Sequence, residues 1–172
     1  NKSATMMYKD KVVNLSLWDT AGQSDYDALR TLSYPDTDCF ILCFSLISQT
    51  SLLNAESTWI PELRKHCPDT PIVLVGTKLD MREAPSRSTS QDELVTQAQA
   101  ERVVKRMNLS GYFETSAKLQ KNVNTVFYKA VEVIIEGKKK PVKKKAGLFS
   151  FLSTSNDEET DDDIEKMREF KL

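Results

Sequence analysis

The chain has 172 residues, 40% of them hydrophobic, and its formal net charge is -1. This length suits one globular domain with a tail, and the balanced charge excludes a general nucleic-acid binder, which carries a basic excess. Three cysteines without a repeated spacing and a single histidine, His66, exclude a zinc site with ordinary ligand spacing. We expect Cys39, Cys43 and Cys67 to be reduced, mostly buried thiols in an intracellular protein.

The first elements of the chain have the pattern of a β-hairpin. Residues 12–18 alternate apolar and polar positions, as a half-buried strand does. Residues 4–8 can pair with this strand across a turn at residues 9–11. The acid that follows, Asp19, therefore stands at the end of a buried strand.

The segment after this strand, Asp19-Thr20-Ala21-Gly22-Gln23, has the residue types that suit a γ-phosphate, Mg²⁺ and an attacking water. A carboxylate at a strand end can hold Mg²⁺, usually through a water molecule, which assigns the metal to Asp19. Gly22 lets its backbone N–H approach the phosphate, and Gln23 can orient the water that attacks phosphorus. The alternative is a strand-ending aspartate with a turn glycine and no such chemistry.

Further along the chain, strands alternate with helices. The apolar runs at residues 39–44 and 72–75 are typical of strands buried on both faces of a parallel sheet. Apolar residues at helical spacing predict three helices, over residues 51–65, 93–107 and 122–135. Ser51 is a candidate cap of the first helix, and Pro61 predicts a kink in it. This alternation predicts a doubly wound α/β sheet with ligands at the carboxyl ends of its strands.

A polar motif, Thr77-Lys78-Leu79-Asp80, follows the second apolar run and fits a guanine base. Asp80 can accept two hydrogen bonds from the guanine N1–H and N2 amine, a donor pair that adenine lacks. The aliphatic stem of Lys78 can lie along the purine face. A solvated Lys–Asp turn is the alternative.

A second motif, Glu114-Thr115-Ser116-Ala117-Lys118, follows a short strand at residues 112–113. The Ala117 N–H can donate to guanine O6, and Ser116 can brace the Asp80 carboxylate. The alternative is a helix N-cap on Thr115 or Ser116.

Taken in order, these motifs resemble the second half of a small GTPase of the Rho family, most similar to its Rac-like members. The resemblance also rests on Asp19 to Asp27, Leu29-Arg30, Leu32-Ser33-Tyr34-Pro35, Cys43-Phe44-Ser45, His66-Cys67-Pro68 and Thr77, where many other GTPases have asparagine. The spacing from Asp80 to Glu114 is longer than in Ras-like proteins and is similar to the Rho insert. Residues 90–93 have the pattern of a capped helix start for that insert.

The resemblance spans residues 1–136 and implies a P-loop NTPase-type, Ras-like sheet that binds GTP or GDP with Mg²⁺. The phosphate-binding loop G-x-x-x-x-G-K-[ST] does not occur in the 172 residues. We expect this loop, switch I and the family's central first strand to lie upstream. A sheet lacking that strand has unpaired edges and an open core, so we expect the 172 residues to fold unstably and to bind guanine weakly.

The same resemblance implies a switch that changes shape in residues 22–32 and works with regulatory proteins. Exchange factors, activating proteins and effectors are expected at Tyr26, Leu29, Arg30, Leu32 and Tyr34. Hydrolysis of GTP is expected only of the intact protein, with Gln23 as the catalytic residue and an arginine supplied by an activating protein.

Three positions depart from the Rho pattern. Ser24 stands where glutamate is usual, which bears on the action of exchange factors. The run Ser116-Ala117-Lys118 is closer to the Ras type. The last residues contain no cysteine four from the end, so we expect no prenylation.

Residues 137–172 differ in composition from the domain at residues 1–136. Six lysines lie between Lys138 and Lys145, and an acidic block runs from Asp157 to Glu165. We expect this tail to be disordered because it has no core-forming pattern. Near an anionic bilayer each lysine contributes up to about 1 kcal/mol, which predicts a reversible contact of a cytoplasmic protein with the inner face of the plasma membrane. A solvated linker or a nuclear-import-like patch is the alternative.

Two alternatives to a GTPase switch stay open. A pseudo-GTPase or scaffold that lacks the phosphate-binding loop would bind its partners through the surface of residues 26–35. A peripheral membrane adaptor would depend on the tail and would keep its localisation without the domain.

Overall fold

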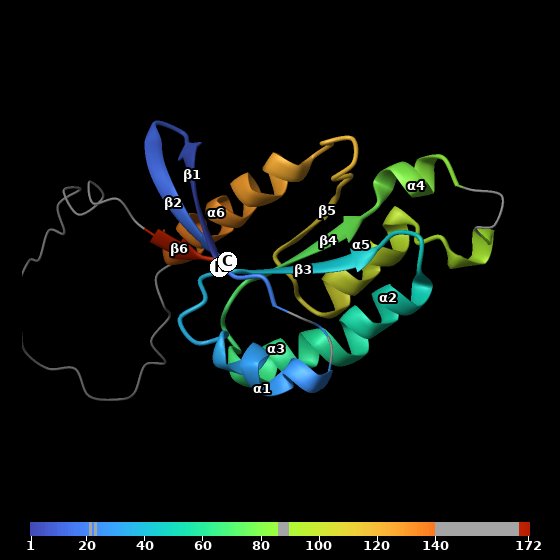
Figure 1. The fold of residues 1–172 in the computed structure, drawn as a ribbon, viewed down its shortest axis with the longest axis horizontal. Coiled ribbons are helices and arrows are strands. Elements are labelled where there is room, and N and C mark those ends of the chain that lie inside the picture. Colours follow the sequence, from blue (N-terminus) through green and yellow to red (C-terminus); the bar gives the residue numbers. More distant parts are fainter. Residues whose placement is uncertain (21, 23, 86–89, 140–168) are drawn as a thin grey trace, which may run out of the picture.

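The computed structural model describes residues 1–20, 22, 24–85, 90–139 and 169–172. Strands β1 (Lys2–Tyr8) and β2 (Lys11–Leu17) form the expected antiparallel hairpin, in which Tyr8 pairs with Lys11. Strands β3 (Phe40–Ser45), β4 (Ile72–Thr77) and β5 (Gly111–Glu114) lie parallel in the order β3-β4-β5. Figure 1 shows these three strands side by side at the centre of the molecule. The prediction of a mixed α/β fold with a parallel sheet is confirmed.

A short strand near the end of the chain, β6 (Glu169–Lys171), pairs in parallel with β2. On its other edge, Lys171 O accepts hydrogen bonds from the N–H groups of Asp38 (3.0 Å) and Cys39 (3.3 Å), just before β3 begins. Strand β6 therefore lies between β2 and the start of β3, where Figure 1 shows it in red. The expectation of disorder is wrong for these residues, and residues 140–168 lie outside the described part of the chain. The place between β2 and β3 is thus occupied by residues 169–172.

One helical segment, composed of α2 (Gln49–Asn54), η2 (Ala55–Trp59) and α3 (Ile60–His66), covers one face of the sheet. Its middle part, η2, is a π-helical turn directly before Pro61. The buried positions step from Ala55 to Ile60, which is one residue more than an α-helix turn allows, so Ile60 rather than Trp59 enters the core. The cap is Ser48, whose side chain accepts from Ser51 N–H, and not Ser51 itself.

Between β4 and β5 the chain forms three helical pieces, α4 (Leu79–Glu83), η3 (Gln91–Glu93) and α5 (Gln97–Arg106). The helix expected over residues 93–107 begins later, because Thr96 caps α5 in a capping box with Gln99. Ser90 does cap a helical turn, since its side chain accepts from Asp92 N–H, but that turn is the short η3.

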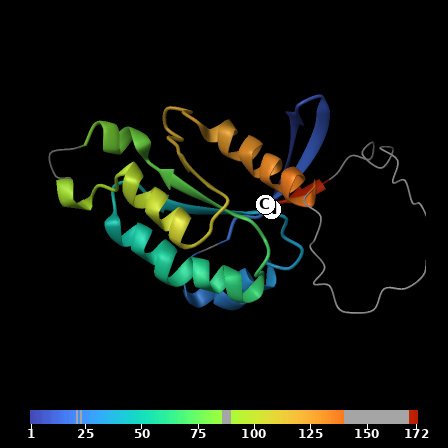
Figure 2. The same ribbon diagram turned by 180° about the vertical axis from the view of Figure 1, so that it is seen from behind.

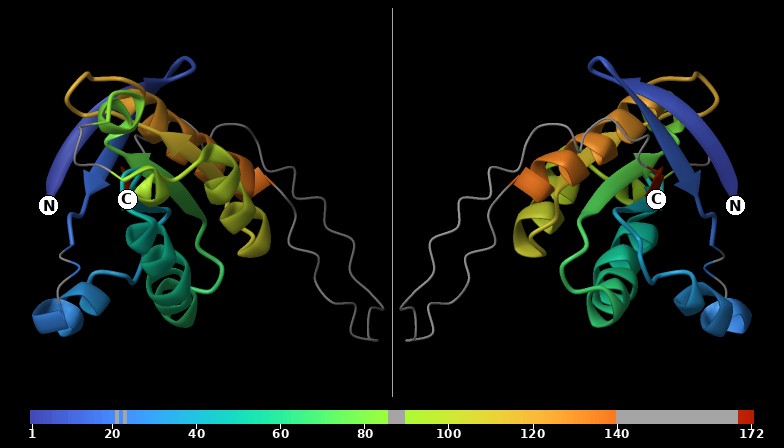
Figure 3. Two further views of the ribbon diagram at one scale, coloured as in Figure 1. Left: turned by 90° about the vertical axis from the view of Figure 1, so that its right-hand side faces the viewer. Right: turned by 90° about the vertical axis from the view of Figure 1, so that its left-hand side faces the viewer.

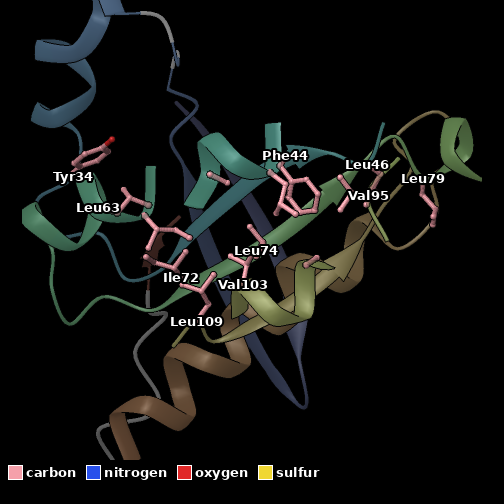
Figure 4. Packing of buried hydrophobic residues seen from close by; sticks show 14 residues of the cluster. Tyr34, Phe44, Leu46, Leu63, Ile72, Leu74, Leu79, Val95, Val103 and Leu109 are labelled. Carbon is pink, nitrogen blue, oxygen red and sulfur yellow. The ribbon is translucent and has the colours of Figure 1, made fainter. Parts of the chain in front are cut away.

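The last helix, α6 (Val123–Lys139), covers the opposite face of the sheet and continues past the expected domain boundary at residue 136. Alternate residues of β4 face the two layers: Ile72 and Leu74 pack with the α2–α3 side, and Val73 and Val75 pack with α6. Figure 2 shows α6 from behind, and Figure 4 shows the first cluster extending along the sheet from Tyr34 and Leu63 to Leu46, Val95 and Leu79.

Between β2 and β3 the chain leaves the sheet through η1 (Ser24–Tyr26) and α1 (Asp27–Leu32). Figure 3 shows these pieces beside α3 and away from α6. Within the described residues, no helix is both long and apolar enough to cross a bilayer.

Candidate functional site

The loop after β4 begins at Lys78, and Thr77, the last residue of the strand, is bonded to the neighbouring strand. The Thr77 hydroxyl donates to Phe44 O (2.9 Å), and Thr77 O accepts from Leu46 N–H (3.0 Å). Lys78 follows with a φ of 62°, in the left-handed region, and begins α4. This conformation turns the chain sharply, so Asp80 comes back toward the next strand of the sheet.

Gly76, the second-last residue of β4, has no room for a side chain. A Cβ atom at this position would lie 2.6 Å from Cδ2 of Leu46 and 3.1 Å from the hydroxyl of Tyr112. Because Leu46 is fully buried, it cannot move aside easily. The glycine thus allows β3, β4 and β5 to approach closely at the carboxyl end of the sheet.

The loop after β5 is bonded directly to the loop after β4. Thr115 N–H donates to Gly76 O (2.7 Å), and Leu79 N–H donates to Thr115 O (2.9 Å). The Ser116 hydroxyl donates to Oδ1 of Asp80 at 2.6 Å, which is the contact expected from the sequence. Two motifs far apart in the sequence therefore form one site at the carboxyl ends of β4 and β5.

Ser116 itself is held rigidly. It is fully buried, its backbone exchanges two hydrogen bonds with Lys121 (3.1 and 2.9 Å), and its Oγ accepts from Leu119 N–H (3.1 Å). Asp80 is half-buried, whereas Lys78, Ala117 and Lys118 are exposed around it. A fixed carboxylate acceptor with exposed backbone N–H and lysine stems beside it is a suitable receptor for a planar base with adjacent donors.

An ion pair beneath this site was not foreseen from the sequence. The guanidinium of Arg82 on α4 binds both carboxylate oxygens of Glu114 on β5, and the Tyr112 hydroxyl donates to Oε1 of Glu114 (2.7 Å). Burial alone would raise the pKa of Glu114, yet hydrogen bonds from Arg82 and Tyr112 hold it below its ordinary value of 4.5. The Glu114 carbonyl accepts from the Asn122 side chain (2.9 Å). No pattern in the sequence pairs residues 82 and 114, because their partnership arises from the β4–β5 neighbourhood.

The segment after β2 is more exposed than the loops after β4 and β5. Asp19, Thr20 and Gly22 are exposed, and Ala21 and Gln23 lie outside the described residues. A Cβ atom on Gly22 would make ordinary contact with the Trp59 ring at 3.5 Å, so the space around it does not require glycine. Asp19 and Thr20 follow the end of β2, and the surroundings of the described residues of this motif do not constrain them.

A pocket of about 330 Å³ lies beside Asp19. Its lining shows whether these residues could hold a triphosphate. Its walls include Leu42, Trp59 and Leu63, and its one basic side chain, Arg30, is engaged by carboxylates of its own. Among the described residues no group of three or more potential metal ligands occurs. The described residues beside Asp19 therefore do not by themselves supply the cationic groups and ligand cluster that phosphate and Mg²⁺ need.

These observations agree with the comparison with protein families. A model of the Ras family matches residues 1–136. The chain belongs to the Ras family. It is therefore a small GTPase domain, of a family whose members bind GTP or GDP with Mg²⁺ and act as molecular switches. The match covers both the guanine-type site and the hairpin that leads to Asp19.

In this Ras-family domain, the segment expected to contact regulators and effectors has two kinds of side chain. Tyr26, Leu29 and Leu32 are exposed, at 45%, 65% and 75%. Arg30 and Tyr34 are each only 5% exposed, so in this conformation their side chains are not available to partners, and the prediction that they contact partners stays a prediction. Arg30 lies on α1 and Tyr34 lies two residues after its end, and both side chains face Glu62 of α3.

Arg30 and Tyr34 hold α1 against α3 through Glu62. Arg30 donates to both oxygens of Glu62 (3.0 and 3.1 Å), and the Tyr34 hydroxyl donates to Oε1 (2.6 Å). Arg30 also pairs with Asp27 (2.7 Å) and lies over the Trp59 ring, 4.8 Å from its centre. The hydrogen bond from Arg30 is the main reason that the pKa of Glu62 lies below 4.5. The role of these residues is to position α1.

Proposed function

We propose that this domain binds the guanine base of GTP or GDP through Asp80, with Ala117 N–H on O6 and Lys78 and Lys118 beside the ring. The observation that carries the proposal is the hydrogen bond from the hydroxyl of buried Ser116 to Oδ1 of half-buried Asp80, which fixes the position of this carboxylate. Mg²⁺ and the γ-phosphate belong near Asp19, Thr20, Ala21 and Gly22 in a protein with a complete phosphate site.

Hydrolysis is proposed only for a protein that carries such a complete site. In that protein Gln23 orients the attacking water, and an activating protein supplies an arginine. The described residues supply no cradle for the phosphates, so base recognition without hydrolysis is the activity proposed for these 172 residues.

The test is nucleotide titration of the 172-residue chain by calorimetry. We expect weak binding of GDP and at least about tenfold weaker binding of ADP, because adenine lacks the donor pair that Asp80 accepts. In Asp80→Asn the amide can donate to xanthine O2, so preference should move from GDP toward xanthosine diphosphate. The matched control is Asp69→Asn, at an exposed aspartate outside the site. Equal binding of GDP and ADP would contradict the proposal.

We also propose that the subfamily is the Rho type and that the switch serves cytoskeletal signalling. The support is the sequence of residues 19–35, Thr77 and the long connection between α4 and α5. The exposed side chains of Tyr26, Leu29 and Leu32 are the proposed contact for exchange factors, activating proteins and effectors. Binding of a Rho-type effector domain, but not of a Ras-type one, by a nucleotide-loaded protein that contains these residues would support the assignment; the reverse preference would overturn it.

A scaffold without catalysis is the second candidate, and the same three exposed apolar residues favour it. It predicts that partner binding is independent of nucleotide. Measuring the affinity of a captured partner with and without GDP separates the two: a change supports the switch, and no change supports the scaffold.

For localisation we propose a cytoplasmic protein that contacts anionic membrane through the lysines from Lys138 to Lys145. Of these, Lys138 and Lys139 end α6, and the others lie outside the described residues. Sedimentation with liposomes that contain phosphatidylserine, but not with neutral ones, is the expected result.

A further inference from the structure

Strand β6 and the next residue are bonded to the sheet on both edges. On the β2 side, Leu172 N–H donates to Ser16 O (3.0 Å) and Leu172 O accepts from Trp18 N–H (2.9 Å). On the β3 side, Lys171 N–H donates to Oδ2 of Asp38 (3.0 Å), and Lys171 O accepts from the N–H groups of Asp38 and Cys39. Successive residues thus bond to opposite neighbours, which is the pattern of a strand inside a sheet.

The side chains of this strand alternate between two different environments. Phe170 and Leu172 are buried, at 3% and 9% exposure, in the cluster that α6 covers. Lys171 points to the opposite face, where its Nζ donates to the carbonyls of Ser33 and Pro35 (2.7 Å to Pro35) and lies 4.6 Å from the centre of the Trp18 ring. Each of these three side chains has its own set of partners. The place between β2 and the start of β3 therefore favours a strand with an apolar, a cationic and an apolar residue in succession.

We propose that the slot between β2 and the start of β3 is a strand-binding site, and that residues 169–172 of this chain are its ligand. The slot recognises an extended segment that runs parallel to β2, with apolar residues at alternate positions and a lysine between them. This is recognition by β-augmentation, in which backbone hydrogen bonds supply affinity and side-chain pockets supply specificity.

The cost of an empty slot is the physical reason for a specific ligand. Without the strand, the N–H groups of Trp18, Asp38 and Cys39 lose their acceptors on Leu172 and Lys171, and the two three-stranded sheets lose the element that joins them. The buried apolar cluster that includes Leu15 and Val131 would be open to water at the position of Phe170. The seated strand therefore joins the hairpin half of the domain to the half that carries the Asp80 site.

The slot also continues beyond its occupant. A pocket of about 250 Å³ begins at Leu172 and is lined by Leu17 and Trp18 on the β2 side, Phe40 and Ile41 of β3, and Phe127 of α6. Its walls are mainly apolar, and they include residues that follow β2 and residues of β3, the two neighbours of β6. The site can therefore take a longer strand of the same orientation.

The experiment uses the full chain with Cys43→Ser and Cys67→Ser and with a specific protease sequence placed between residues 139 and 169. Cleavage leaves the strand held by noncovalent contacts alone. Cys39 is the reporter, because it is fully buried against the strand, and burial raises the pKa of its thiol to about 12. Size-exclusion chromatography measures retention of the cut segment, and a thiol reagent measures exposure of Cys39.

We expect the cut segment to co-elute at high protein concentration, and Cys39 to react at least about tenfold faster on dilution, when the segment leaves. Excess peptide of residues 165–172 should restore protection. The same peptide with Phe170→Asp and Leu172→Asp should not, and Lys171→Met should protect only at several-fold higher concentration.

Two outcomes would overturn the proposal: release of the segment with Cys39 still protected, or equal protection by the wild-type and doubly substituted peptides. If cleavage unfolds the domain, circular dichroism measures the loss of secondary structure. Recovery of the spectrum on addition of the wild-type peptide supports the strand-binding site, and failure to recover contradicts it.

Discussion

The two ends of the nucleotide-type site differ in how firmly the chain holds them. At the base end, Asp80, Ser116 and Gly76 are fixed by hydrogen bonds and close packing between β3, β4 and β5. At the phosphate end, Asp19 and Gly22 are exposed beside an apolar pocket. The proposed base-binding end is thus held in place by contacts within residues 72–122, whereas the proposed phosphate end needs groups that the described residues do not supply. Parallel substitutions at the two ends test this comparison.

The largest expected effect on stability is that of Gly76→Ala. The new methyl group would overlap Leu46 in a closely packed place, so we expect a loss of about 1–3 kcal/mol in the free energy of unfolding, measured with urea. Gly22→Ala is the matched change at the phosphate end and should alter stability by less than about 0.5 kcal/mol. Equal effects at the two glycines would remove the contrast.

The next effect concerns Ser116→Ala and is measured as GDP affinity. Loss of the hydroxyl frees the Asp80 carboxylate to rotate, and we expect about tenfold weaker binding, which corresponds to about 1.4 kcal/mol. Thr20→Ala, at the phosphate end, should change the affinity of this chain by less than about twofold. A larger loss for Thr20→Ala would show that the phosphate end already contributes to binding.

A smaller effect, dependent on pH, is expected for Glu114→Gln. The pKa of Glu114 lies below 4.5 in the folded state, so its ionised form stabilises the fold above that pH, and this contribution is lost as pH falls. The variant should be about 1 kcal/mol less stable at pH 7 and should approach the parent as pH drops below about 4.5. Glu93→Gln, at an exposed position, is the control. A pH-independent difference would rule out the ionised pair with Arg82 as the cause.

The smallest effect on stability is expected for Leu29→Ser with Leu32→Ser, because both side chains are exposed. We expect thermal unfolding within about 0.5 kcal/mol of the parent, together with loss of binding to any partner of the switch surface. Glu62→Gln, on α3 where it holds Arg30 of α1, should instead lower stability and leave the exposed apolar side chains in place.

Much of the base end was predictable because its residues act through short motifs. The contact between Ser116 and Asp80 follows from motif order and from strands that end at one edge of a sheet. The burial of Arg30 and Tyr34 was not predictable, since both are polar residues whose partner, Glu62, lies on a distant helix. A charged residue at a helix surface gives no sequence cue about which long-range ion pair it will join.

The π turn and strand β6 show a second limit of prediction from the sequence. The apolar spacing of residues 51–65 predicted a regular helix with a kink at Pro61, but a π turn precedes that proline and brings Ile60 into the core. Four residues after a long polar tail carry no strand pattern of their own. Phe170 and Leu172 form a strand because an empty place in the sheet exists for them, which is a property of the tertiary structure. The instability predicted for the chain stays a prediction; a thermal scan of Phe170→Asp beside the parent measures what β6 contributes.

The π turn at Ala55–Trp59 has a consequence for any insertion or deletion in this helix. Removal of one residue from the turn would restore an α-helical turn and rotate everything after it by about 100°. Glu62 would then leave Arg30, and Trp59 would leave the guanidinium that it now covers. The helix would survive with its length almost unchanged, yet α1 would lose its anchor. The number of residues in one turn thus sets which face of the helix meets the switch segment.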